Sequence, residues 1–137
     1  MFGNTGKIVE VNLTTGAVER KTLPEEYYKK YIGGSGLAAK LFWDRGDFTS
    51  DPLAPEATLT FMNGPFAGLK MAGASRNSVT GRSPLTGVWG DSSCGGYFAP
   101  ELRYAVSCLI STVLPLTSNS LSERVNRFSA MPPSSVR

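Results

Sequence analysis

The spacing of apolar side chains predicts a β-hairpin at the start of the chain. Apolar and polar residues alternate over residues 6–13 (GKIVEVNL) and again over residues 17–23 (AVERKTL), as expected for strands with one buried face. The intervening Thr14-Thr15-Gly16 supplies the glycine that a tight turn favours. The first part of the chain therefore predicts two antiparallel strands.

Two short helices should follow this hairpin. Pro24 and the two acidic residues after it suit the first turn of a helix, which should stop at Gly33-Gly34. Apolar residues recur at helical spacing over residues 37–45, which predicts a second helix.

The segment between these helices contains a possible dinucleotide-binding motif. Residues 34–39 (GSGLAA) match the form G-x-G-x-x-A. That motif requires a buried strand directly before it, whereas residues 25–32 (EEYYKKYI) are polar and helix-like. The glycines are therefore interpreted as a link between two helices, and a Rossmann site is rejected.

Short strands separated by turns are predicted in the middle of the chain. Residues 51–55 (DPLAP) form a turn-rich connector, and residues 57–62 (ATLTFM) are typical of a strand. An extended strand is expected over residues 75–82, followed by a turn at residues 83–87 and a return to the sheet at Val88-Trp89.

A last helix is predicted near residue 100. Asp91-Ser92-Ser93 carry side chains that can cap a helix, and residues 100–105 (PELRYA) are typical of a helix start. The strands outnumber these short helices, so the fold class expected is α+β and rich in β-structure.

Composition restricts the kind of protein. A chain of 137 residues that is 41% hydrophobic can bury one core and form one domain. The formal charge is +3, but basic and acidic residues are interspersed, which disfavours nucleic-acid binding. The N-terminus lacks a signal-peptide pattern and no apolar run approaches the roughly 18 residues of a membrane span. A cytoplasmic protein is expected.

The chemistry open to the chain alone is limited. It contains Cys94 and Cys108 but no histidine, which excludes the common transition-metal ligand sets as well as Ser-His and Cys-His catalysis. Without an export signal, the two cysteines are expected to be reduced thiols.

Residues 73–98 (GASRNSVTGRSPLTGVWGDSSCGGYF) concentrate glycine, serine and threonine around Arg76 and Arg82. Such permissive backbone suits either ordinary hairpin turns or a surface that approaches a ligand closely. The residues alone leave both interpretations open.

Four segments in fixed order carry a family resemblance: residues 3–16 (GNTGKIVEVNLTTG), 31–44 (YIGGSGLAAKLFWD), 63–68 (NGPFAG) and 73–105. Over about residues 1–105 the chain resembles the N-terminal domain of the aldehyde ferredoxin oxidoreductase family. The resemblance implies a β-rich base, two sheets packed with short helices, that cradles a tungsten- or molybdenum-bis-pterin cofactor.

The same resemblance implies a reaction. Family members oxidise an aldehyde and water to a carboxylic acid and pass two electrons through a [4Fe-4S] cluster to ferredoxin. In the family, the cysteines that bind this cluster come from later domains. The ligands of the cluster are therefore absent here, and this chain alone is expected to be inactive. The metal, the aldehyde and the oligomeric state remain open.

The resemblance also implies cofactor contacts at Arg76, Ser93, Gly95 and Gly96. The arginine of the ASR motif contacts cofactor phosphate in similar proteins, a role that suits a guanidinium. The two glycines let the backbone run against a ligand before a helix start with unpaired N–H groups. Ser93 stands where family members often carry an asparagine that helps bind a magnesium ion between the pterins, so its side-chain role stays open.

Simpler interpretations exist for these residues. Arg76 can be a solvated arginine at a sheet edge, and Ser93 a helix cap before a glycine turn. Cys94 is expected to be a small buried thiol rather than a metal ligand. Trp89 and Tyr97 either flank the pterin or, more commonly for such aromatics, close a core.

The tail, residues 106–137, departs from the family pattern. It contains no glycine and lacks the Gly-Tyr-Asp continuation expected after Ala105. We hypothesise a frameshift near codon 106 that leaves the tail largely without structure; the alternative is a divergent tail in which residues 106–116 add a strand. Translation of the other two reading frames distinguishes these.

A second functional hypothesis is a freestanding module that binds a pterin, a phosphate compound or a partner protein without catalysis. Downstream sequence that encodes the family's cysteine-bearing domains favours an interrupted enzyme, whereas an intact short gene favours the module. If the later domains are missing, uncovered apolar surface should make the chain prone to self-association.

Overall fold

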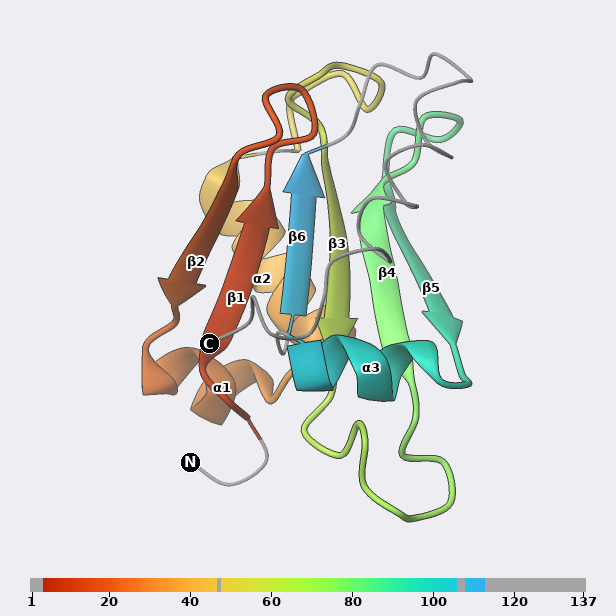
Figure 1. The fold of residues 1–137 in the computed structure, drawn as a ribbon. Helices are drawn as coiled ribbons and strands as arrows, with labels where there is room; N and C mark the ends of the chain where they lie inside the picture. Colours follow the sequence, from red (N-terminus) through yellow and green to blue (C-terminus); the bar gives the residue numbers. More distant parts are fainter. Residues whose placement is uncertain (1–3, 47, 106–107, 113–137) are drawn as a thin grey trace.

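The structure, a computed structural model, describes residues 4–46, 48–105 and 108–112 (Figure 1). In chain order the elements are β1 (Lys7–Val11), β2 (Val18–Thr22), α1 (Glu25–Tyr31), α2 (Gly34–Arg45), β3 (Thr58–Asn63), β4 (Asn77–Arg82), β5 (Trp89–Cys94), α3 (Phe98–Ala105) and β6 (Cys108–Thr112). None of the helices in the described ranges is long and apolar enough to cross a membrane.

The strands form a sheet in the order β2-β1-β6-β3-β4-β5. It contains two antiparallel parts, the hairpin β1–β2 and the group β6-β3-β4-β5, which correspond to the two sheets expected. A parallel pairing between β1 and β6 joins the two parts edge to edge, so that they form one continuous layer. The β-rich α+β class is confirmed.

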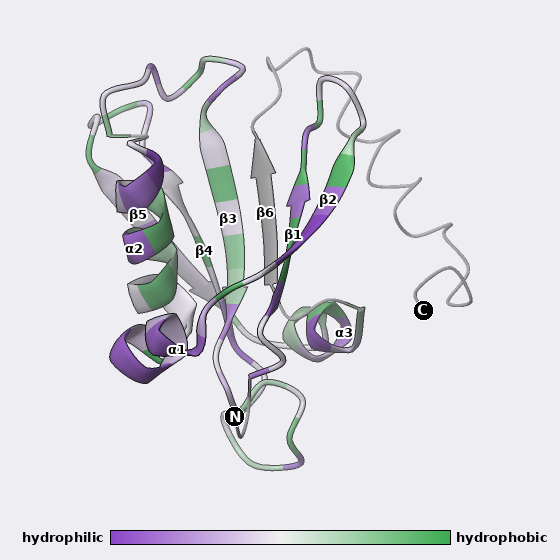
Figure 2. Cartoon of the chain, turned by 90° about the vertical axis from the view of Figure 1, so that its left-hand side faces the viewer, coloured by the Kyte–Doolittle hydropathy of each residue, from purple (hydrophilic) through white to green (hydrophobic). Residues whose placement is uncertain are grey.

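The helices lie on both faces of the sheet. Figure 2 shows α1 and α2 on one face and α3 on the other, at one end of the strands. The buried core between the sheet and the helix pair α1–α2 consists of Ile8, Tyr28, Leu37, Ala38, Leu41 and Met62. The sheet therefore lies between helices on both faces, with α3 at one end of its strands (Figure 2).

The N-terminal hairpin is confirmed and has an identifiable turn. Asn12 closes it, because its backbone N–H donates to Ala17 over 2.8 Å and its carbonyl accepts from Gly16 over 2.7 Å. The side-chain oxygen of Asn12 accepts two further backbone N–H groups, from Thr14 and Thr15, each at 3.0 Å. An asparagine side chain that mimics a backbone turn in this way fixes the strand register.

The first helix ends as predicted, but the second begins earlier. α2 starts at Gly34, so the glycines predicted to link two helices form its first turn instead. Gly33, the residue before the helix, has φ 154°, and a Cβ on it would lie 2.9 Å from the carbonyl oxygen of Asn63. Glycine at this position lets the start of α2 pass close to the end of β3. Because α1 precedes the motif, the strand that a dinucleotide fold needs is not at this place in the chain.

The strands of the central region agree with the prediction, but one cap assignment is wrong. Asp91-Ser92-Ser93 lie within β5 and pair with β4, Asp91 opposite Thr80 and Ser93 opposite Ser78. The helix begins at Phe98, after the two glycines. Pairing with β4 therefore extends further than the local sequence indicates.

Part of the tail enters the sheet. Residues 108–112 form β6 between β1 and β3, which agrees with the alternative that residues 106–116 add a strand. Residues 106–107 and 113–137 lie outside the described residues. The domain boundary at residue 105 and the frameshift remain predictions.

Candidate functional site

The residues predicted to contact a cofactor gather at one end of the sheet. Arg76 directly precedes β4 and Ser93 is the penultimate residue of β5. The antiparallel register places Ser78 opposite Ser93, so Arg76 reaches the same end, where its Nη1 donates to Ser93 Oγ over 3.4 Å. Gly95 and Gly96 follow immediately. The structure thus brings together all four residues.

Arg76 is exposed and weakly held. Its bond to Ser93 is long for a guanidinium, and it makes no ion pair within the described part of the chain. Most of its donors therefore face solvent. A guanidinium in this state can form paired hydrogen bonds to a phosphate with little competition from the protein.

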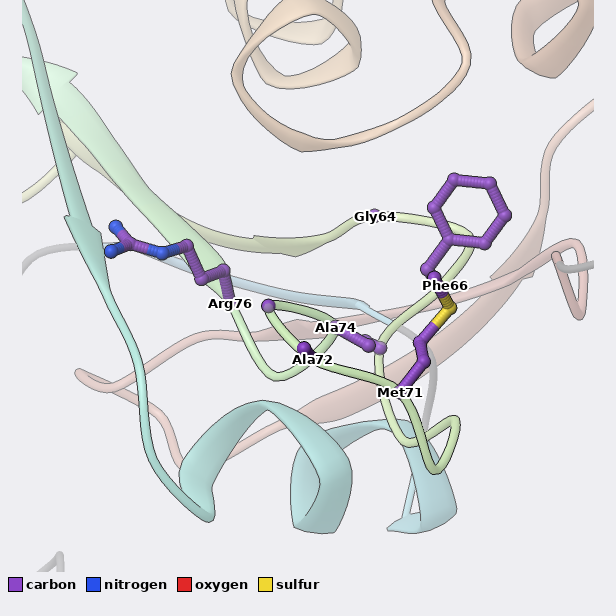
Figure 3. A pocket seen from close by; sticks show the side chains of 8 residues that line it. Gly64, Phe66, Met71, Ala72, Ala74 and Arg76 are labelled. Carbon is purple, nitrogen blue, oxygen red and sulfur yellow. The ribbon is translucent and has the colours of Figure 1, made fainter.

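A pocket of about 280 Å³ adjoins Arg76 (Figure 3). It is lined by Gly64, Phe66, Ala67, Met71, Ala72, Gly73, Ala74 and Arg76. Small side chains dominate this lining, and the guanidinium in Figure 3 points away from Phe66 and Met71. The arrangement combines an apolar hollow with a cation at its edge.

The loop that forms this pocket is fixed to α3. Arg103 Nη1 donates to the carbonyl oxygen of Pro65 over 2.8 Å, and the Tyr104 hydroxyl donates to that of Gly68 over 3.2 Å. Sequence reasoning missed these two residues, because only the fold brings α3 to the loop. The NGPFAG segment, which includes Pro65 and Gly68, was the available signal for the loop itself.

The two glycines expose their backbone. Gly96 has φ +97°, a conformation that L side chains rarely adopt, and a Cβ placed on it would have no neighbour within 4 Å. A Cβ on Gly95 would lie 3.7 Å from the carbonyl oxygen of Ser75. Peptide groups in this segment are therefore accessible to a ligand.

The structure shows the surroundings of three side chains near the site: Cys94, Tyr97 and Trp89. Cys94 is exposed rather than buried, because it ends the edge strand β5. Tyr97 is 87% exposed and closes no core. Trp89 packs against the core, with its ring 5.0 Å from that of Phe42, and so takes the structural role.

Arg82, the second arginine of residues 73–98, is held by the fold instead of being free in solvent. Its Nε donates to the carbonyl oxygen of Gly87 over 2.7 Å, and its Nη1 donates to that of Ser50. The side chain is partly buried by these contacts and joins the turn after β4 to the segment after α2. Its role is structural.

We therefore expect Arg82→Glu to destabilise the fold by about 1–3 kcal/mol, because it removes both hydrogen bonds and turns a carboxylate toward two carbonyl oxygens. Urea unfolding of the chain measures this. Arg20→Glu, on the exposed strand β2, is the control for the charge change alone. Equal losses in the two variants would contradict the structural role.

The site contains no cluster of metal ligands. In the described ranges, no group of three or more His, Cys, Asp or Glu side chains is placed to hold a metal ion. The titrating groups with shifted pKa values lie on α1, α2 and β2. The hydrogen bond from Lys40 lowers the pKa of Asp44, and Asp44 raises the pKa of both Lys40 and Tyr27 through hydrogen bonds. On β2, the hydrogen bond to Glu10 raises the pKa of Lys21. Among the described residues that line the pocket, Arg76 is the one cation, and it lies near the exposed backbone of Gly95 and Gly96.

Fold and site together define a β-rich α+β domain with a cationic, glycine-rich end suited to an anionic ligand. Residues 8–110 match the family described as aldehyde ferredoxin oxidoreductase, N-terminal domain. The chain belongs to this family.

Individual relatives support this membership. The tungsten-containing aldehyde ferredoxin oxidoreductase of Pyrococcus furiosus is 41% identical over 105 residues, which are 77% of this chain and 17% of the relative. The enzyme of the same description from Pyrococcus abyssi is 40% identical over 105 residues, again 77% of this chain and 17% of the relative.

A solved structure shows the same fold. The active site complex BamBC of benzoyl coenzyme A reductase, in complex with 1,5-dienoyl-CoA, superposes with a TM-score of 0.77 at 37% sequence identity. The match covers 81% of this chain and 17% of that one. The chain thus spans about one sixth of the length of the proteins that it matches.

Proposed function

We propose that residues 1–105 are the cofactor-cradling N-terminal part of an aldehyde:ferredoxin oxidoreductase. The observation that carries the proposal is the meeting of Arg76, Ser93, Gly95 and Gly96 at one end of the sheet, beside a pocket lined by small residues. Cation, hydroxyl and exposed peptide groups are the donors that a phosphate requires. The residues present therefore fit the phosphate-bearing part of a pterin cofactor.

Each residue has a distinct part in this proposal. Arg76 binds cofactor phosphate through paired donors, while Gly95 and Gly96 let the backbone approach the ligand. Ser93 contacts Arg76 through its hydroxyl, and its backbone groups would help to hold a magnesium ion. When bound, the tungsten- or molybdenum-bis-pterin supplies the two-electron oxidation of aldehyde and water to carboxylic acid.

Electron transfer to ferredoxin needs residues that this sequence lacks. A [4Fe-4S] cluster is held by four cysteine thiolates, whereas the chain contains only two cysteines and no histidine. We therefore propose that the chain contributes to cofactor binding and is inactive by itself.

Anaerobic purification of the chain from a host that makes the pterin cofactor tests this proposal. Pterin fluorescence and metal analysis report binding, and a dye-linked aldehyde oxidation assay reports activity. We expect bound pterin without aldehyde oxidation. Oxidation by the isolated chain, or pterin levels no higher than in an unrelated protein from the same host, would contradict the proposal.

We also expect the isolated chain to self-associate. Several large apolar residues of the pocket loop and α3 are exposed: Phe66, Leu69, Met71, Phe98 and Tyr104. Burial of such a surface against another copy is favourable. Size-exclusion chromatography at increasing concentration measures the effect; a monomer throughout would favour the freestanding binding module.

A further inference from the structure

A row of three polar side chains crosses the sheet face that carries α3. Asn63 of β3 lies opposite Asn77 of β4, and Asn77 lies opposite Cys94 of β5. Directly opposed residues of antiparallel strands point to the same face of the sheet. The side-chain amide of Asn63 donates to the carbonyl oxygen of Ala99 over 3.0 Å, which places the row at the start of α3.

Two buried atoms of this row have no hydrogen-bond partner among the described residues. Asn77 is 2% exposed; its Oδ1 accepts the thiol proton of Cys94 over 2.7 Å, but its Nδ2 is unpartnered. Asn63 is 4% exposed and its Oδ1 is likewise unpartnered. Because orphaned buried N–H groups are rare in native proteins, the Asn77 amide marks a place where an acceptor is expected.

The row reaches solvent at Cys94. This residue is a free, exposed thiol at the end of the edge strand β5. Gly95 and Gly96 follow it, and the space around Gly96 is open. Cys94 is therefore accessible from solvent at the edge of the sheet, in a segment with little side-chain bulk after it.

We propose that Cys94 is a site of covalent modification by small-molecule disulfides, and that the side chain of Asn77 positions its sulfur through a hydrogen bond. In the resting state the thiol donates to Asn77 Oδ1. When the thiol proton passes to solvent, the sulfur can only accept, and a half-turn of the Asn77 amide directs an Nδ2 N–H toward it. The otherwise unpartnered donor then has its acceptor.

The reaction is a thiol–disulfide exchange. The deprotonated Cys94 sulfur attacks one sulfur of the small disulfide, and a new S–S bond forms as the old one breaks. The second sulfur leaves as a thiolate and takes a proton from solvent. Cys94 is oxidised to a mixed disulfide and the leaving sulfur is reduced. This reaction needs no bound cofactor. Its product lies between Ser93 and Gly95, two of the residues that are proposed to contact the cofactor.

Oxidised glutathione is the probe for this site. The purified 137-residue chain is incubated with it, and peptide mass mapping separates adducts on Cys94 from those on Cys108. We expect a mixed disulfide at Cys94 that dithiothreitol removes, formed faster in the folded chain than in urea, because only folding places Asn77 beside the sulfur. Slower modification of Cys94 in the folded chain than in urea would overturn the proposal, as would exclusive modification of Cys108.

Variants test the part played by Asn77. Asn77→Asp keeps an acceptor and removes the donor, so adduct formation at Cys94 should slow by about tenfold, the effect expected for loss of a hydrogen bond to a charged group. Ser92→Ala, on the same exposed strand, is the matched control and should leave the rate unchanged. A natively folded Asn77→Asp chain that reacts at the unaltered rate would refute the role of Asn77. If that variant does not fold, the rates of adduct formation at Cys94 in the folded natural chain and in urea still test the proposal.

Discussion

Arg76→Glu will lower the pterin and tungsten content of a chimeric enzyme at least about tenfold. The chimera carries residues 1–105 of this chain in place of the corresponding N-terminal residues of the Pyrococcus furiosus relative, which is 41% identical over 105 residues. The reason is electrostatic: the substitution removes paired hydrogen bonds to phosphate and puts a negative charge where the proposed ligand is negative. Metal analysis and pterin fluorescence of the anaerobically purified protein measure the loss.

The matched control is Arg20→Glu in the same chimera. Arg20 is an exposed arginine on the edge strand β2, so the substitution makes the same change in net charge away from the site. It should leave the cofactor content unchanged. Equal cofactor content in the Arg76 and Arg20 variants, both folded, would show that Arg76 makes no phosphate contact.

Leu37→Ala will destabilise the chain by about 2–5 kcal/mol, the range measured for large-to-small changes in protein cores. Leu37 is fully buried between α2 and the sheet, and its removal leaves a cavity beside Met62 and Tyr28. For a domain whose total stability is about 5–15 kcal/mol, this is a large fraction. Urea unfolding at neutral pH measures the change as a lower transition midpoint.

Leu85→Ala is the control for this substitution. Leu85 is 93% exposed in the turn between β4 and β5, so the same truncation should change the stability by less than about 0.5 kcal/mol. A Leu37→Ala midpoint equal to that of Leu85→Ala would contradict the core described here.

The elements that the sequence predicts correctly are those with local causes. The alternation before and after Asn12 defines the first hairpin, and its turn is closed by bonds within six residues. α1 likewise combines acidic residues in its first turn with basic residues in its last. In both cases the stabilising contacts join near neighbours in sequence, so the pattern is sufficient.

The elements that the sequence predicts incorrectly depend on distant partners. The start of α2 follows Gly33, which passes close to Asn63, thirty positions further along the chain. Arg82 is structural because its partner Ser50 lies in another connection. Cys94 is exposed because β5 forms the edge of the sheet, which local composition does not reveal.

The candidate site shows the same division. The ASR motif and the glycine pair indicated Arg76, Gly95 and Gly96, but their proximity follows from the pairing of β4 with β5. The pocket beside Arg76 also requires α3, whose Arg103 and Tyr104 hold the loop. The sequence therefore identified the candidate residues, whereas the fold shows that they lie together at one end of the sheet.

The most direct test of the account is the cofactor content of the chimera with residues 1–105 unaltered. If this chain supplies a working cradle, the folded chimera will retain pterin and tungsten at a level close to that of the Pyrococcus furiosus enzyme prepared in parallel. A folded chimera that carries neither pterin nor tungsten, while the parallel enzyme is fully loaded, would contradict the proposed cofactor-binding role of this domain.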